Sequence, residues 1–79
     1  MKLKLMFFGA LRDQFNETEI DVQDGATVLD LLVALKQLRP SAEKLLSASR
    51  VAVKDDIVEK NMVLSEGCEV FFLPPASGG

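Results

Sequence analysis

The chain has 79 residues, of which 48% are hydrophobic and 27% are charged, and its formal net charge is -3. This length fits one small domain with an apolar core and leaves no room for a second domain. Acidic and basic residues are spread along the chain without a basic stripe, and tryptophan and tyrosine are absent, so nucleic-acid binding is not expected.

We expect neither a membrane span nor a secretory leader, because no apolar stretch reaches about 18 residues and no charged segment precedes one. The single cysteine, Cys68, has no partner for an internal disulfide. We interpret it as a structural residue at a strand start rather than as a reactive thiol. Together these features predict a protein of the reducing cytoplasm.

The residue types that carry most enzyme chemistry are scarce. The chain has no histidine and one cysteine, which leaves almost nothing for a zinc or transition-metal site or for general acid–base catalysis near neutral pH. It contains no phosphate-binding loop, dinucleotide fingerprint or nucleophile elbow. We therefore expect no catalytic residue, no metal and no stably bound cofactor, and a protein that is not an enzyme on its own.

The first element is a predicted strand over residues 2–8, where side chains alternate between two faces. One face carries Leu3, Leu5 and Phe7, and the other carries Lys2, Lys4, Met6 and Phe8. Residues 9–13 predict a loop or short turn. Residues 18–22 predict a second strand, which ends before the turn-forming pair Asp24-Gly25.

The clearest predicted helix begins after Thr27, which forms a pattern like a capping box with Asp30 three residues later. Its apolar stripe consists of Val28, Leu31, Leu32, Leu35 and Leu38. Pro40 ends the helix, because proline has no backbone N–H and its ring clashes with the preceding turn. Residues 41–46 allow one or two further turns, and residues 47–49 are a small-residue connector.

The last third of the chain predicts two short strands and one longer strand. Residues 51–53 and 57–58 flank a polar turn, as in a hairpin. Residues 68–73 form the final strand. The first and last strands are the most apolar, which suits neighbours at the centre of a sheet.

This order of elements predicts an α+β domain of the β-grasp type, with a mixed sheet of about five strands around one main helix. The domain spans residues 1–73. Residues 74–79 form a flexible C-terminal tail that ends in Gly-Gly.

A single helix leaves the other face of the sheet open. The alternation of side chains places Met6 and Phe8 of the first strand on that face, together with Phe71 and Leu73 of the last strand. These four residues predict an exposed apolar patch beside the tail, and such patches mark protein-binding sites. The alternative is that sheet twist or a loop buries part of the patch.

The tail begins with Pro74-Pro75 and ends with Ser77-Gly78-Gly79. Proline keeps the backbone stiff and extended, and glycine lacks a Cβ, so its backbone can pass close to another protein. We expect the tail to carry its terminal carboxylate away from the domain and into a narrow channel of a partner. The alternative is a frayed terminus without chemistry.

These residues together resemble the ubiquitin-like sulfur carriers, and most closely the small subunits of molybdopterin synthase. The resemblance lies in the opening strand and turn at 5–12, the helix start at 24–28, and the segment 66–79, which reads EGCEVFFLPPASGG. The third segment is the most specific, because an apolar strand runs into Pro-Pro, a spacer, Ser and a terminal Gly-Gly. The likeness covers essentially the whole chain.

The resemblance implies that Gly79 is the covalent site. In this family an E1-like adenylating enzyme uses ATP to activate the terminal glycine, and a sulfur donor protein then leaves a thiocarboxylate there. The large subunit of molybdopterin synthase receives the carrier, and the sulfur passes to a pterin precursor in molybdenum cofactor biosynthesis. The implied threading residues are Pro74, Pro75, Ser77 and Gly78, and the implied partner-binding residues are Met6, Phe8, Phe71 and Leu73.

Other functions stay open. The chain is also compatible with a sulfur carrier for thiamin synthesis or tRNA thiolation, with a protein modifier joined to lysines through Gly79, and with a plain interaction domain. Thiamin carriers fit less well, because they tend to lack the stretch Phe71-Phe72-Leu73-Pro74-Pro75. The mass of the intact protein separates these functions, since a thiocarboxylate, a conjugate and an unmodified terminus differ in mass.

Overall fold

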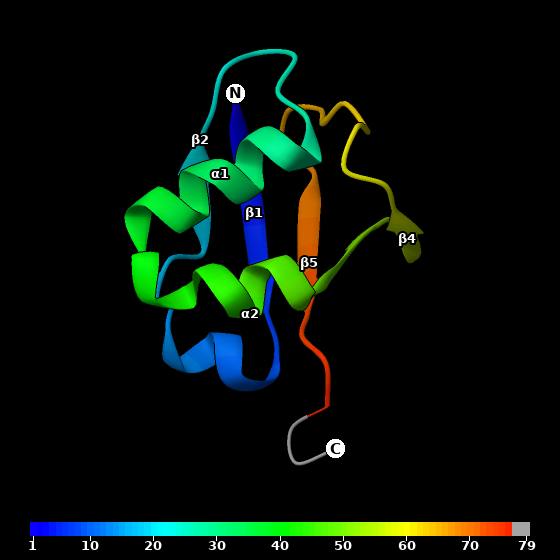
Figure 1. Ribbon diagram of the computed structural model, residues 1–79. Helices are drawn as coiled ribbons and strands as arrows, with labels where there is room; N and C mark the ends of the chain where they lie inside the picture. The colour runs from blue at the N-terminus through cyan, green and yellow to red at the C-terminus, as the bar shows by residue number, and fades with distance from the viewer. Residues whose placement is uncertain (77–79) are drawn as a thin grey trace.

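Residues 1–76, which the computed structural model describes, contain five strands in one mixed sheet, two α-helices and two short 3-10 helices (Figure 1). The strands are β1 (Lys2–Phe7), β2 (Glu19–Asp21), β3 (Arg50–Val53), β4 (Asp56–Val58) and β5 (Glu69–Leu73). The helices are η1 (Gly9–Asp13), α1 (Val28–Leu38), η2 (Pro40–Ala42) and α2 (Glu43–Ala48). Ser77, Gly78 and Gly79 lie outside the described residues.

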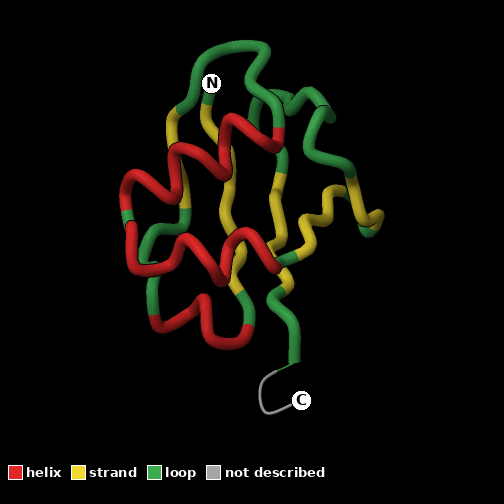
Figure 2. Tube along the Cα trace, in the orientation of Figure 1, coloured by secondary structure: helices red, strands yellow, loops and turns green. Residues whose placement is uncertain are grey.

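β1 and β5 are parallel neighbours inside the sheet, as the sequence predicts. The strand order is β2-β1-β5-β3-β4, and the other pairs of neighbours are antiparallel. Helices α1 and α2 lie together on one face of this sheet (Figure 2). The architecture is therefore the predicted α+β, β-grasp fold with a mixed five-stranded sheet.

The capping box predicted at the start of α1 is confirmed. The backbone N–H of Asp30 donates to Thr27 Oγ1 at 3.2 Å, and the N–H of Thr27 donates to Asp30 Oδ2 at 2.9 Å. Two N–H groups that the helix leaves unpaired are thus satisfied. At the other end, Arg39 leaves the helical conformation with φ -136 and ψ 82, because it precedes Pro40.

A second helix, α2, shares the covering of the sheet with α1. The sequence predicted only one or two turns at 41–46 and a connector at 47–49, whereas α2 continues to Ala48. Ala42 and Leu46 are both buried in the core, which explains the extra helix. The difference arises because six residues are too few for helical periodicity to be clear in the sequence.

The core lies between the sheet and the helices. Val70 and Phe72 of β5 are fully buried there, as the alternation predicts. The ring of Phe7 stacks on Phe72 at a centroid distance of 4.9 Å and on Phe15 at 4.5 Å. Burial of one such side chain stabilises the fold by about 1.5–3 kcal/mol. Phe15 is a core residue that the sequence did not reveal, because its neighbours are polar and follow no period.

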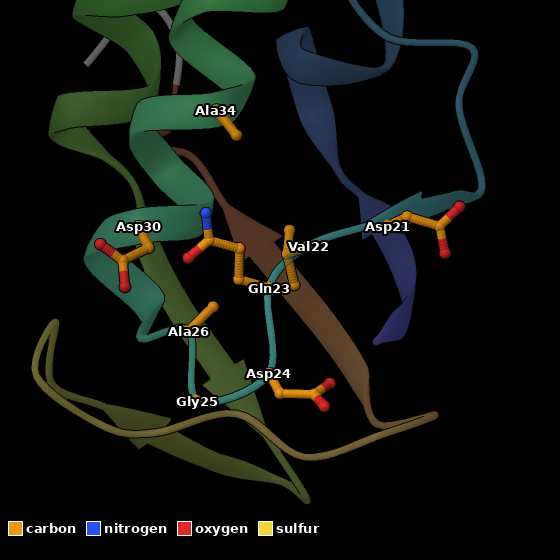
Figure 3. Close-up of a pocket in the computed structure, with 8 residues that line it drawn as sticks. All are labelled: Asp21, Val22, Gln23, Asp24, Gly25, Ala26, Asp30 and Ala34. Atoms are coloured by element: carbon orange, nitrogen blue, oxygen red, sulfur yellow. The ribbon is translucent and has the colours of Figure 1, made fainter.

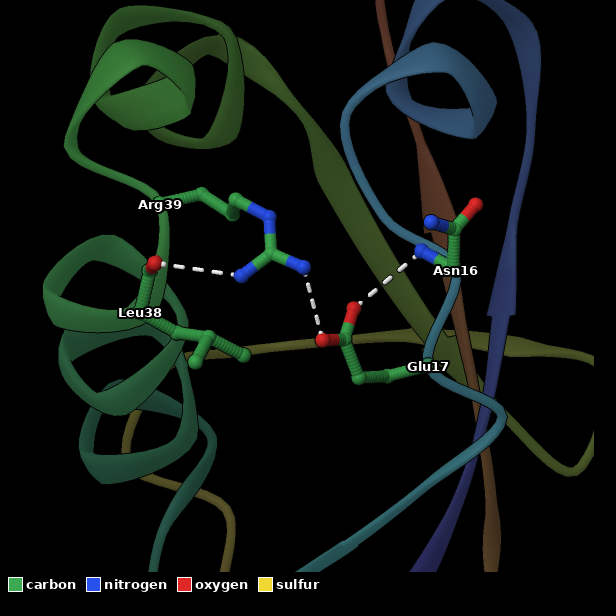
Figure 4. Close-up of polar contacts among 4 residues, drawn as sticks. All are labelled: Asn16, Glu17, Leu38 and Arg39. Atoms are coloured by element: carbon green, nitrogen blue, oxygen red, sulfur yellow. Dashed lines mark hydrogen bonds and ion pairs between the residues drawn. The ribbon is translucent and has the colours of Figure 1, made fainter.

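An ion pair joins the loop before β2 to the end of α1 (Figure 4). Arg39 Nη2 donates to Glu17 Oε2 at 2.7 Å, and the backbone N–H of Asn16 donates to Glu17 Oε1 at 3.1 Å. The pKa of Glu17 is held below its ordinary value of 4.5 by a hydrogen bond from its own backbone N–H and then by Arg39. The charged form of Glu17 is therefore favoured in the folded chain.

Candidate functional site: the open sheet face and the root of the tail

The face of the sheet opposite α1 and α2 carries a row of apolar residues that crosses four strands. Met6 on β1 lies opposite Phe71 on β5, and Phe71 lies opposite Ala52 on β3. Ala52 in turn lies opposite Ile57 on β4. Because residues in register share a face, these side chains form one continuous band.

The four residues predicted for the patch lie on this face. Phe8 follows β1, and its ring stacks near that of Phe71 at a centroid distance of 6.1 Å. Met6 and Phe8 are 42% and 41% exposed, whereas Phe71 and Leu73 are half-buried. The geometry is as predicted, and the role of these residues in binding a partner stays a prediction.

Sequence reasoning missed two members of the band, Ala52 and Ile57. The hairpin alternation was visible, but the position of β3 and β4 beside β5 is a tertiary pairing that the sequence pattern does not give. Ile57 is 54% exposed. We define the open-face patch as Met6, Phe8, Ala52, Ile57, Phe71 and Leu73.

Charged residues border the open-face patch on the side away from the tail. Lys4 on β1 lies opposite Glu69 on β5 and opposite Glu19 on β2. At the tail end, Arg50 on β3 lies opposite Leu73. An apolar centre with a charged margin has the composition of a protein-binding surface.

The tail leaves the sheet directly beside this patch. β5 ends at Leu73, and the chain continues past the end of the sheet that is opposite the N-terminus (Figure 1). Pro74 is half-buried, and Pro75 and Ala76 are exposed. A hollow of about 270 Å³ lies at this root of the tail, between the turn after β1 and the segment that follows β5. The threading residues Ser77 and Gly78 and the covalent site Gly79 lie outside the described residues.

A second hollow, of about 350 Å³, lies between the loop after β2 and the start of α1 (Figure 3). Its carboxylates, those of Asp21, Asp24 and Asp30, point in different directions. Asp30 is engaged in the helix cap, and Asp24 lies 3.6 Å from the N-terminal amine. Within residues 1–76 no group of three or more His, Cys, Asp or Glu is arranged to hold a metal ion.

Cys68 packs against the edge of the core and is half-buried. Cys68 directly precedes β5, and its structural role stays a prediction. Within residues 1–76, no helix has the length and apolar character needed to cross a membrane.

The fold and the tail at the end of β5 define the chain as a ubiquitin-like β-grasp domain. The model of the ThiS family matches residues 5–79, and the chain belongs to this family. This finding confirms the resemblance to the ubiquitin-like sulfur carriers.

Known proteins similar to the chain agree with this assignment. It is 34% identical over 82 residues to the molybdopterin synthase sulfur carrier subunit of Mycobacterium tuberculosis, covering 100% of this chain and 99% of the relative. SAMP1 from Haloferax volcanii has a TM-score of 0.84 at 24% identity over 100% of both chains, which shows likeness of fold alone. A complex of subunits 1 and 2 of the molybdopterin-converting factor from Helicobacter pylori contains a chain with a TM-score of 0.65 and 26% identity, over 100% of both chains.

Proposed function

We propose that this chain is the sulfur carrier subunit of a molybdopterin synthase. The observation that carries the proposal is the 34% identity, over the full length, to a subunit of that name. The chain also has the parts that such a carrier needs, namely an apolar sheet face and an adjacent tail that ends in Gly-Gly. The chain would supply the cargo site, and its partners would supply the catalytic groups.

The first step of the proposed cycle activates the carboxylate of Gly79. A carboxylate is a poor electrophile, because attack on it must expel an oxide-like leaving group. An E1-like enzyme therefore lets a carboxylate oxygen attack the α-phosphorus of ATP, which releases pyrophosphate and forms an acyl adenylate. The terminal sulfur of a persulfide on a donor protein then attacks the carbonyl carbon, and AMP leaves with the electron pair. A thiol cleaves the resulting acyl disulfide, which leaves a thiocarboxylate on Gly79 and a disulfide on the thiol's side.

The second step delivers the sulfur to a pterin precursor. The thiocarboxylate sulfur attacks a carbon of the precursor, and an oxygen substituent of that carbon leaves with the bonding electron pair. Water then attacks the carbonyl carbon of Gly79, the carbon–sulfur bond to the carrier breaks with its electron pair on sulfur, and the carboxylate is restored. This step needs a large subunit that binds the precursor, and the complex of two subunits known for the Helicobacter pylori relative supports such a partner. We place the cycle in the cytoplasm, where ATP and reduced sulfur donors are available.

The open-face patch would hold the carrier on each partner while the tail reaches the active site. Exposed Met6, Phe8 and Ile57 supply apolar area that is lost from water on docking. Pro74 and Pro75 stiffen the tail and reduce the entropy lost when it is threaded. Gly78 allows the end of the tail to enter a narrow channel of the partner, because a side chain at this position would crowd the channel.

A transfer assay tests this function. Purified chain is incubated with the adenylating enzyme, ATP, a sulfur donor, the large synthase subunit and the pterin precursor, and dithiolene product is measured. We expect Gly78→Ala, and a variant with one residue added after Gly79, to lose transfer while keeping the far-ultraviolet circular dichroism spectrum of the unchanged protein. Normal transfer by the extended variant would rule the mechanism out.

A further inference from the structure

Gly9 and Pro74 lie close together at the root of the tail, although they come from near opposite ends of the chain. Gly9 is the first residue of η1 and has a φ of +55. A Cβ added to Gly9 would lie 3.0 Å from Cγ of Pro74. That separation is shorter than ordinary van der Waals contact between carbon atoms, so a side chain at this position requires Pro74 to shift by a few tenths of an ångström.

The same comparison at the other described glycines with positive φ gives a different result. Gly25 has a φ of +83 and Gly67 a φ of +76, and a Cβ at either would meet nothing within 4 Å. All three glycines relieve backbone strain. Only Gly9, among these three, also makes room for another segment of the chain.

The contact at Pro74 acts on the backbone of the tail. The Cγ atom belongs to the pyrrolidine ring, which is closed on the backbone nitrogen, so it can yield only by a change of ring pucker or by a shift of the backbone. A displacement larger than a change of pucker can absorb moves the main chain where it leaves β5. Pro75 follows directly and keeps the next step stiff, so a shift at Pro74 is passed along the tail.

The turn that begins at Gly9 and lies beside Pro74 is joined to the open-face patch. Phe8, a patch residue, directly precedes Gly9, and its backbone N–H donates to the carbonyl oxygen of Phe72 at 3.2 Å. Phe8, Gly9, Leu73 and Pro74 also line one hollow of about 270 Å³. The surface that would dock on a partner and the start of the tail are therefore held by the same few residues.

We propose that Gly9 is a positioning residue for the tail, a role that rests on the proposed function. By leaving space for Pro74, it fixes the direction in which the tail leaves the sheet relative to the open-face patch. A docked carrier then presents its terminal carboxylate at the partner's active site without a search over many tail directions. Such pre-organisation raises the rate of the step that follows docking.

The first test measures adenylation by the E1-like enzyme, followed as pyrophosphate release, for Gly9→Ala and Gly9→Asn. Asparagine tolerates positive φ better than most residues, so Gly9→Asn adds bulk with little backbone strain. Because misplaced reacting groups slow a reaction steeply, we expect kcat to fall about three- to tenfold in both variants. KM for the chain should change less, since the docking patch is intact.

Matched controls separate tail positioning from backbone strain. Gly25→Ala and Gly25→Asn place the same side chains at a similar positive φ in open space, so their kcat should equal that of the unchanged chain. Pro74→Ala removes the ring that a side chain at residue 9 would strike. Adding Gly9→Asn to Pro74→Ala should therefore lower kcat much less than Gly9→Asn alone.

The proposal is overturned if Gly9→Asn has the kcat of Gly25→Asn, or if the effects of Gly9→Asn and Pro74→Ala simply add. A second measurement needs no partner. In the free chain, nuclear Overhauser effects should join the Gly9 Hα protons to the Pro74 ring, and their absence would also overturn the proposal. If the unchanged chain shows these nuclear Overhauser effects but is not adenylated, the proposed function fails, whereas the close approach of Gly9 to Pro74 is still confirmed.

Discussion

The Phe8 and Phe71 rings lie 6.1 Å apart, with their planes inclined by 24°. The alternation along β5 places Phe71 on the sheet face opposite the buried Val70 and Phe72. Phe8 directly follows β1, and Phe71 lies in β5, the strand that leads into the tail. The pair therefore joins an exposed residue of the open-face patch to the strand from which the tail departs. Docking and delivery would occur at the same corner of the domain.

Replacing Phe8 with glutamine should weaken docking without unfolding the domain. Phe8 is 41% exposed, so its loss costs little in the free chain but removes an aromatic contact from the complex. We expect Kd for the large subunit, measured by isothermal titration calorimetry, to rise about tenfold or more. Leu29→Gln is the control, because Leu29 is 47% exposed on α1, away from the patch. Equal losses of affinity in the two variants would argue against the patch.

Replacing Phe72 with alanine should strongly destabilise the domain. Its side chain is fully buried and stacks on Phe7 at 4.9 Å. Truncation of a buried phenylalanine leaves a cavity and costs about 3–5 kcal/mol. Urea unfolding followed by circular dichroism measures this loss, and a loss below about 1 kcal/mol would contradict the burial of Phe72.

Thr27→Ala should lower stability through the helix cap alone. The substitution removes the oxygen that accepts from the N–H of Asp30 at 3.2 Å. Loss of such a cap costs about 1 kcal/mol in unfolding free energy. Thr18→Ala is the matched control, because Thr18 is exposed and precedes β2 outside any helix. The two variants should differ in their urea midpoints, and identical midpoints would show that the cap contributes nothing.

The ion pair of Glu17 and Arg39 predicts a small dependence of stability on pH. The pKa of Glu17 is lowered in the folded chain, so its contribution is present above pH 4.5 and is lost as the pH falls through the folded pKa. Glu17→Gln should therefore lower Tm slightly at pH 7, and the difference from the unchanged chain should shrink below pH 4.5. A difference that grows on acidification would have the wrong sign for this pair.

Much of this arrangement could be predicted from the sequence because its strongest patterns are local. Thr27 with Asp30 marks the start of α1, and the alternation in β1 and β5 assigns Met6 and Phe71 to the open face. These assignments need only the period of an element and the chemistry of its ends.

The parts that could not be predicted depend on contacts between distant segments. Ile57 joins the open-face patch only because β3 pairs with β5, and Phe15 is buried only because its loop folds over Phe7. The space that Gly9 leaves for Pro74 likewise arises from the parallel pairing of β1 with β5. No periodicity within one segment carries this information.

The mass of the intact chain after incubation with its adenylating enzyme, ATP and a sulfur donor tests the central claim most directly. The account predicts a gain equal to the difference between one sulfur and one oxygen atom, located by fragmentation on Gly79. The gain should be absent without ATP and absent in a chain extended beyond Gly79. An unchanged mass under conditions in which the enzyme activates a known carrier would contradict the account, and so would conjugates to lysines of other proteins in place of a thiocarboxylate.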